Sequence, residues 1–154
     1  MYELCLYRSG ILFRFVLSDS KIAVIFAFIR IIMAEHNELG RWGEEVARDY
    51  LLTQGYAIGG ENIRIAGVEI DFIAMRDDAI CFVEVKTRAT DFTDPADAID
   101  NRKRSRLVRA ADTYINSYDI PLEPRFDIVL VIGNPMNYTV EHIPDAFLPN
   151  LNNR

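Results

Sequence analysis

The chain has few of the residues that hold small secreted or zinc-binding proteins together. Its 154 residues include two cysteines and two histidines, which excludes a disulfide framework and a cysteine-based zinc site. His36 and His142 lie far apart, and neither has a metal-ligand spacing, so we expect no zinc site. Cys81 lies in an apolar run, where a buried thiol is expected. This composition fits a reducing compartment, and we expect a cytoplasmic protein.

Positive charge and long apolar runs are also scarce. The chain has 17 Lys and Arg against 23 Asp and Glu, a formal net charge of -6. Such a balance excludes a protein that coats nucleic acid indiscriminately, although it permits a local site. The longest uncharged apolar run in the opening segment, residues 22–29, has eight residues, whereas a membrane span needs about 20. The composition is that of a globular protein of one domain's length, with no membrane partner expected.

The opening segment differs from the rest of the chain. Residues 1–32 hold four bases and two acids, so the remaining 122 residues carry a formal charge of -8. Three interpretations stay open: a non-native or mis-assigned leader, a helix or strand packed on the domain, and a membrane or export signal. We favour the first, with the working chain starting at Met33. The working domain is then residues 33–143, followed by residues 144–154 as a loosely ordered tail.

The pattern after Met33 predicts two helices and five strands. Apolar residues recur at helical spacing between Asn37, an N-cap, and Gly55, a helix stop. Pro95, a good first-turn residue, opens a second helical pattern that Pro121 ends. The predicted helices cover residues 37–55 and about 95–118, and the predicted strands cover residues 57–65, 68–75, 79–87, 126–132 and 138–143. The order α-β-β-β-α-β-β indicates an α/β fold.

The second and third strands carry the most informative pattern. If Asp77 and Asp78 form a two-residue turn, opposed residues have numbers that sum to 155. Asp71 then faces Glu84 and Glu69 faces Lys86, all on one side of the sheet because side chains alternate with period two. The opposite side is apolar throughout and is predicted to be core: Val68, Ile70, Phe72, Ala74, Cys81, Val83 and Val85.

This cluster of three carboxylates and one ammonium has two interpretations. In the first, Lys86 neutralises its neighbours in a solvated patch. In the second, the acids hold a divalent cation, because Mg²⁺ prefers carboxylate oxygens. The flanking runs are so apolar that we expect a sheet covered on both faces, where an idle charge cluster is costly. The spacing alone leaves both interpretations open.

A resemblance to a known family begins at these residues. Asp71, twelve further residues and Glu84-Val85-Lys86 resemble the PD-(D/E)xK nuclease signature, and a longer stretch resembles the YraN-like family of predicted endonucleases, which are similar to Holliday-junction resolvases. Where that family usually has Gly before the Glu-Ile-Asp triplet, this chain has Val68. The matching positions are Gly40, Gly43, Glu44, Ala47, Tyr50, Leu51, Gly55, Tyr56, Asn62, Arg64, Glu69, Ile70, Asp71, residues 82–86, Arg88, Lys103, Ala111 and residues 125–127.

The resemblance implies a restriction-endonuclease-like fold, a mixed β-sheet flanked by helices, and a metal-dependent endonuclease that hydrolyses phosphodiester bonds in DNA, branched or single-stranded forms included. Asp71 and Glu84 would hold Mg²⁺, with Mn²⁺ as a substitute and the Val85 carbonyl as an extra ligand. Lys86 would orient or help deprotonate the attacking water.

Two further acids have open roles. The family position of Glu44 implies contact with the metal or its water, and the alternative is a pair with an arginine or with the helix dipole. For Glu69, metal contact and a pair with Lys86 are equally favoured.

A confined basic strip is the remaining candidate feature. Five bases fall within eight residues of the second predicted helix, in an otherwise acidic domain. A solvated helix face is the ordinary interpretation, and phosphate positioning beside the carboxylates is the alternative. We expect a nucleic-acid-binding set of Arg88, Arg102, Lys103, Arg106 and Arg109. The rival to a nuclease is a non-catalytic nucleic-acid-binding or protein-interaction module that retains the fold.

Overall fold

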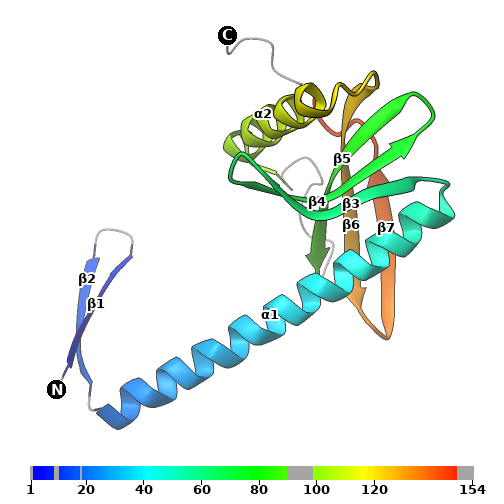
Figure 1. Ribbon diagram of the computed structural model, residues 1–154. Helices are drawn as coiled ribbons and strands as arrows, with labels where there is room; N and C mark the ends of the chain where they lie inside the picture. Colours follow the sequence, from blue (N-terminus) through cyan, green and yellow to red (C-terminus); the bar gives the residue numbers. More distant parts are fainter. Residues whose placement is uncertain (1, 9–10, 18, 90–98, 149–154) are drawn as a thin grey trace. The chain divides into compact units, whose positions relative to one another are not determined.

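The computed structural model describes residues 2–8, 11–17, 19–89 and 99–148 (Figure 1). The chain divides into two compact units, Met1–Glu38 and Leu39–Arg154. In the first unit, β1 (Tyr2–Arg8) and β2 (Ile11–Leu17) pair as antiparallel strands, with Tyr2 opposite Leu17. Helix α1 (Asp19–Thr53) begins in this unit and ends in the second. Among the described residues, no helix is long and apolar enough to cross a membrane.

The second unit is a five-stranded mixed sheet with a helix on each face. The strands lie in the order β3-β4-β5-β6-β7, and β5 and β6 are the parallel pair. The order α-β-β-β-α-β-β and the mixed α/β sheet flanked by helices are therefore confirmed. The elements are β3 (Ala57–Ile65), β4 (Val68–Arg76), β5 (Ala79–Arg88), α2 (Asn101–Tyr118), β6 (Glu123–Asn134) and β7 (Asn137–Ile143).

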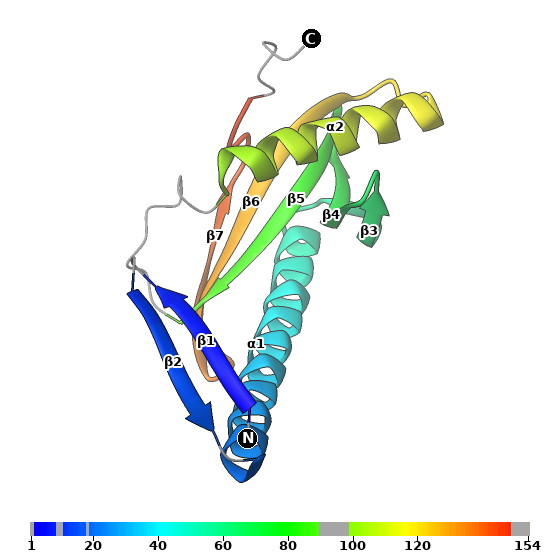
Figure 2. The ribbon, with the colours of Figure 1, turned by 90° about the vertical axis from the view of Figure 1, so that its left-hand side faces the viewer.

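Each helix packs against its own face of the sheet, and Figure 2 shows α2 across one face and the C-terminal part of α1 behind the other. Ala47 and Leu51 of α1 pack with Phe72, Val83 and Val129. On the other side, α2 packs with a second cluster whose members include Leu107, Ala110, Ile73, Ile80, Phe82 and Phe126. Residues 80–85 of β5 are buried without a break, as expected for a central strand covered on both faces.

Both helix starts differ from the prediction. Asn37 was expected to cap the first helix, but α1 begins at Asp19, because residues 19–39 contain neither Gly nor Pro to stop it. The second helix was expected from about Pro95, which lies outside the described residues. Ile99 is not helical, and Asp100 is the N-cap, accepting the backbone N–H of Lys103 at 2.8 Å.

The hairpin register is confirmed where β4 and β5 pair. Partners run from Arg76–Ala79 to Phe72–Val83, so each sum is 155. The predicted single core side is wrong, however: Val68 and Ile70 belong to the α2 core, whereas Phe72 and Ala74 belong to the α1 core. The division falls at Asp71, where the pairing of β4 with β5 ends.

The turn before β4 has a left-handed backbone. Ala66 and Gly67 link β3 to β4 and have positive φ values of 49° and 76°. Gly67 accepts such a backbone at no steric cost. Val68 is thereby free to extend as the first buried residue of β4.

The segment after β7 returns to the sheet at the residues that the structure describes. Ala146 donates its backbone N–H to the Phe126 carbonyl at 2.7 Å. The Phe147 ring stacks on Phe126 with centroids 4.9 Å apart and is 9% exposed. The expected loose tail therefore does not begin at residue 144. Residues 149–154 lie outside the described part of the chain.

Candidate functional site

Glu84 lies at the centre of the candidate site. It is 2% exposed on the central strand β5. Its Oε1 atom accepts hydrogen bonds from the ammonium groups of Lys86, at 2.6 Å, and of Lys103. The chain has only three lysines, so two of them converge on one carboxylate oxygen. The other oxygen, Oε2, is buried and receives no hydrogen bond from any residue that the structure describes.

Asp71 lies beside Glu84 at the end of the β4–β5 ladder. Its Oδ2 accepts the backbone N–H of Val85 at 2.6 Å. Burial, and then the charge of Glu84, raise the pKa of Asp71 to about 7, although the Val85 hydrogen bond and the charge of Lys103 act in the opposite direction. The predicted pair of opposed acids is therefore close enough to interact electrostatically.

Glu44 reaches the neighbourhood of Asp71 from α1. Asn62 donates a hydrogen bond to Glu44 Oε2 at 3.2 Å. On β3, Glu61 pairs with Phe72 and Ile63 pairs with Ile70. Asn62 lies between them and is therefore opposite Asp71 of β4. The charge of Glu44 also raises the pKa of Asp71. These contacts favour the site interpretation of Glu44 over an arginine pair.

Gly43 allows α1 to come this close to the sheet. A Cβ atom at Gly43 would lie 1.8 Å from Thr87 Oγ1 on β5, far inside any real contact. Only a residue without a side chain permits this approach. The helix turn that contains Glu44 is thereby held against the end of β5.

Glu69 does not make the predicted pair with Lys86. Its exposed carboxylate lies 3.7 Å from the Arg64 guanidinium, across the β3–β4 ladder, while Lys86 pairs with Glu84. The reason is that the β4–β5 ladder has ended at Phe72–Val83, so the sum of 155 no longer applies at Glu69. Glu69 as a metal ligand stays a prediction.

The donor atoms of this site suit a hard cation. Asp71 and Glu84 contribute carboxylates, one of them with an unpartnered buried oxygen, and Val85 is the adjacent residue whose carbonyl was predicted as a ligand. Mg²⁺ is usually held by one or two carboxylates together with water and substrate phosphate. Within the described residues, no three Asp, Glu, His or Cys side chains form a group that could hold a metal ion by themselves. The residues therefore fit an open Mg²⁺ site and do not fit a closed one.

The basic strip on α2 divides between two surroundings. Arg102, Arg106 and Arg109 are exposed and line one shallow surface hollow, whereas Lys103 turns inward to Glu84. One sequence signal could have shown this difference, since Lys103 shares a helical stripe with the buried residues at i+4 and i+7. Arg88 is half-buried at the end of β5.

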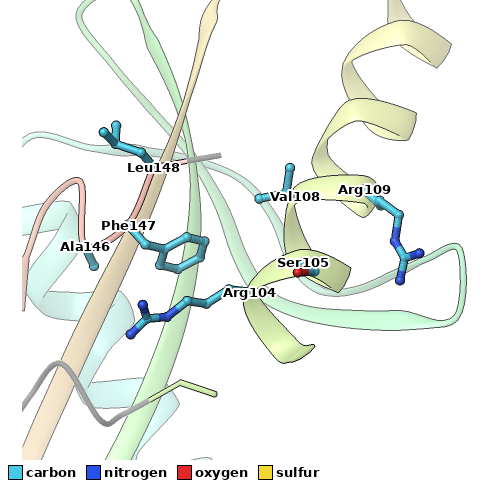
Figure 3. Close-up of a pocket in the computed structure, with 7 residues that line it drawn as sticks. All are labelled: Arg104, Ser105, Val108, Arg109, Ala146, Phe147 and Leu148. Atoms are coloured by element: carbon cyan, nitrogen blue, oxygen red, sulfur yellow. The ribbon is translucent and has the colours of Figure 1, made fainter. Parts of the chain in front are cut away.

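A pocket of about 440 Å³ borders the first turns of α2 (Figure 3). The Arg104 guanidinium lies 5.6 Å from the centroid of the Phe147 ring, and its Nε–H donates to the Ile99 carbonyl at 3.0 Å. These contacts tie the start of α2 to the segment after β7. They therefore support the helix turn that presents Lys103. The pocket is lined by Arg104, Ser105, Val108, Arg109, Ala146, Phe147 and Leu148.

Asp127 forms a second polar centre that the sequence did not predict. It is 1% exposed on β6 and accepts two hydrogen bonds from Arg125 at 2.8 Å each. The His142 ring lies 2.9 Å from Oδ2, and the Asp145 backbone N–H donates to Oδ1 at 3.1 Å. Arg125 also donates to the Tyr56 hydroxyl at 2.5 Å. Arg125 therefore pairs within its own strand, β6.

Comparison with known proteins identifies a family for the chain. The model of the family described as "Uncharacterised protein family UPF0102" matches residues 43–131, a stretch that contains Glu44, Asp71, Glu84, Lys86, Lys103 and Asp127. A UPF0102 protein of Bacteroides thetaiotaomicron is 46% identical over 120 residues, which cover 77% of this chain and 99% of that protein. UPF0102 protein BF0634 of Bacteroides fragilis is 48% identical with the same coverage. UPF0102 protein FP2501 of Flavobacterium psychrophilum is 41% identical over 116 residues, 75% of this chain and 98% of its own length.

Proposed function

The chain belongs to the uncharacterised protein family UPF0102, and we propose that it is a divalent-metal-dependent endonuclease that hydrolyses phosphodiester bonds in DNA. The observation that carries this proposal is the buried carboxylate of Glu84, which has two ammonium groups on one oxygen and no described partner on the other. A buried polar atom without a hydrogen bond costs free energy, and so does the approach of a second acid, Asp71. A bound cation would offset both costs.

The roles of the residues follow from their positions. Asp71 and Glu84, with the Val85 carbonyl, would hold Mg²⁺, which supplies charge stabilisation at the scissile phosphate. Lys86 lies on the same strand face as Glu84 and would orient the attacking water or, in its neutral amine form, accept the proton of that water. Glu44, which accepts a hydrogen bond from Asn62, would bind a metal-bound water. The resemblance to YraN-like predicted endonucleases supports these assignments.

The charge distribution favours contact with a few phosphate groups of the substrate close to the site. The domain is acidic overall, and its exposed Arg102, Arg106 and Arg109 lie on one helix whose first turn also carries Lys103 into the site. Phosphate groups next to the scissile bond could be held there, without a basic surface along a long duplex. This arrangement suits DNA in which the backbone bends sharply or becomes single-stranded.

A cleavage panel tests the proposal directly. Duplex, forked, four-way and single-stranded DNA, and RNA, are incubated with the full chain in Mg²⁺, in Mn²⁺ or in EDTA. We expect metal-dependent cleavage of at least one DNA, and loss of at least about a hundredfold in rate for Asp71→Asn, Glu84→Gln and Lys86→Ala. Asp77→Asn is the matched control, because it removes a carboxylate from the turn of the same hairpin and Asn tolerates the positive φ of 55°. Equal cleavage by all variants would assign the activity to a contaminant.

One observation favours a second candidate function, a non-catalytic nucleic-acid-binding or protein-interaction module. Two lysines, Lys86 and Lys103, already neutralise Glu84. Such a module would bind DNA equally well in EDTA and in Mg²⁺, and Asp71→Asn would leave that binding unchanged. Measurement of DNA affinity under both conditions therefore separates the two functions.

A further inference from the structure

Lys103 on α2 pairs with the buried carboxylate of Glu84 on β5, and we propose that it is the counter-ion of the metal-free site, which a divalent cation displaces from Glu84. This inference rests on the proposed function, because it concerns the same two carboxylates. It assigns Lys103 a role different from that of the arginines beside it in the sequence.

The contact of Lys103 with Glu84 joins two residues that are distant in the sequence, unlike the contact of Lys86 with Glu84. Lys86 lies two residues from Glu84 on the same strand face, so its contact is local. Lys103 comes from the first turn of α2, nineteen residues away, where Asp100 caps the helix by binding the Lys103 N–H. The capped helix therefore fixes the backbone from which the Lys103 ammonium reaches the acid.

The two partners differ in how easily they can separate. The side chain of Glu84 is 3% exposed, whereas that of Lys103 is 35% exposed. A long half-exposed lysine can move its ammonium into water while its methylene groups stay packed. Glu84 on the central strand has no such freedom. If a competing cation arrives, Lys103 moves and the carboxylate stays.

Lys103 binds one of the two acids that would hold the cation. Its ammonium bonds Oε1 of Glu84, while Oε2 of the same carboxylate is buried and receives no hydrogen bond from a described residue. Two positive charges a few ångströms apart repel each other strongly in a half-buried site. A divalent ion on Asp71 and on Oε2 of Glu84 would therefore weaken the hold of Oε1 on Lys103.

The released ammonium would then be available to the substrate. Lys103 is adjacent to the exposed Arg102 in sequence and one turn from Arg106. A phosphate that enters the site could accept a charge-assisted hydrogen bond from it. Metal binding and phosphate binding would in this way be coupled, because the metal frees a phosphate ligand.

Calorimetric titration of Mn²⁺ into the full chain without nucleic acid tests this exchange. Lys103→Met removes the competing ammonium, so we expect its Mn²⁺ dissociation constant to fall by about tenfold or more, as loss of a nearby like charge predicts. Arg109→Gln removes the same charge six residues further along the same helix and should change the constant less than about twofold. Lys103→Arg keeps the charge and should stay close to the wild type. Equal constants for Lys103→Met and Arg109→Gln would overturn the proposal.

A second measurement needs no variant that might fail to fold. The chain has three lysines, Lys21, Lys86 and Lys103, so acetylation of each can be followed by mass spectrometry. We expect saturating Mg²⁺ to increase the labelling rate of Lys103 at least about threefold relative to Lys21. Acylation needs the neutral amine, and a lysine held in an ion pair with a carboxylate reaches that form less often than one released into water. A decreased or unchanged rate at Lys103 would contradict displacement.

The same titrations separate failure of this inference from failure of the proposed function. Mn²⁺ binding to the wild type that is lost in both Asp71→Asn and Glu84→Gln establishes the metal site. If that site is present and Lys103→Met behaves like Arg109→Gln, only the role of Lys103 is wrong. If the wild type shows no Mn²⁺ binding that depends on the two acids, the proposed function is wrong, and the counter-ion role fails with it.

Discussion

Val85 donates its backbone N–H to the carboxylate of Asp71 at 2.6 Å, at the point where β4 stops pairing with β5. A continuing antiparallel ladder would give this N–H a backbone carbonyl as partner. The Asp71 side chain takes over that function, so the two strands can part while the N–H of Val85 stays satisfied. Glu84 follows Val83, the last residue of β5 that pairs with β4. The separation of the strands therefore leaves Asp71 and Glu84 close enough to interact electrostatically.

Asp71 makes the stability of the protein depend on pH. Its pKa is raised from 3.8 to about 7, first by burial and then by Glu84, so the folded state keeps the proton to higher pH than the unfolded chain does. The free energy of unfolding should therefore fall between about pH 4 and pH 7. Asp71→Asn lacks this titration, and its stability relative to the wild type should grow over that range and then level off.

Urea denaturation in EDTA at pH 4.5, 6 and 8 checks this expectation for Asp71. Asn keeps an oxygen that can accept the Val85 N–H, so the comparison isolates the charge. Asp77→Asn on the exposed turn of the same hairpin should show a constant difference from the wild type at all three pH values. A difference between Asp71→Asn and the wild type that is independent of pH would contradict the raised pKa.

The exposed arginines of α2 should contribute to DNA binding through charge alone. Arg102→Gln, Arg106→Gln and Arg109→Gln should each weaken binding to unrelated sequences by a similar factor, and each should reduce the slope of log K against log salt by about 0.7 to 0.9. Fluorescence anisotropy at four salt concentrations measures the slope. Arg48→Gln is the control, because Arg48 is already engaged by Glu61 at 2.6 Å. An unchanged slope in all three variants would show that the strip is a solvated face.

The contact between Gly43 and Thr87 should be visible in stability. Gly43→Ala places a methyl group against Thr87 Oγ1, and we expect a loss of about 1–3 kcal/mol as in other overpacked sites. Gly40→Ala, on the same helix with nothing within 4 Å of the added carbon, should instead stabilise by about 0.5–1 kcal/mol through helix propensity. Thermal and urea unfolding measure both. Thr87→Ala should recover part of the loss in Gly43→Ala, and additive effects would contradict the contact.

Local patterns predicted most of the sheet. The predicted strand at residues 57–65 coincides with β3, and the Asp77-Asp78 turn gave the register of β4 and β5. Both succeed because turn residues and alternation act within a few positions. The start of α1 was missed for the same reason, since Asn37 has the properties of a cap but lies inside a longer helix.

The site could be predicted only in part, because its decisive contacts are long-range. The sequence placed Asp71 opposite Glu84, and the structure brings them together. It also placed Glu69 opposite Lys86, which fails because the strands part at Asp71. The direction of the Lys103 side chain, toward Glu84, depends on how α2 packs on the sheet. In the sequence, Lys103 is one of five bases within eight residues and is not distinguished from the arginines near it.

Asp127 should be among the most important residues for stability. Burial raises the pKa of Asp127, but hydrogen bonds with His142, Arg125 and the Asp145 backbone N–H lower it by a larger amount. The net pKa therefore lies below the usual value. Asp127→Asn turns an amide toward these donors and should cost about 3–5 kcal/mol, as other broken buried ion pairs do. The depressed pKa adds stability that is present above the unfolded value of 3.8 and lost as the pH falls below it.

Urea denaturation at pH 7 and pH 3 tests both statements about Asp127. The penalty of Asp127→Asn should be large at pH 7 and smaller at pH 3, where the wild type has lost much of the benefit. Asp145→Asn is the matched control, because Asp145 contributes its backbone N–H to the network and Asn tolerates its positive φ of 52°. Equal penalties for the two variants would contradict a central role of the Asp127 carboxylate.

Phe147 should behave as a core residue although it lies close to the end of the chain. Its ring stacks on Phe126 and lies beneath Arg104, so Phe147→Ala should cost about 3–5 kcal/mol, the usual loss for a buried phenylalanine. The adjacent Leu148 is 72% exposed, and Leu148→Ala should change stability by less than about 0.5 kcal/mol. Arg104 links this ring to the helix turn that carries Lys103. Phe147→Ala should therefore reduce the difference in Mn²⁺ dissociation constant between the chain with Lys103 and the chain with Lys103→Met. Equal stability of the two alanine variants would show that the segment after β7 does not support the site.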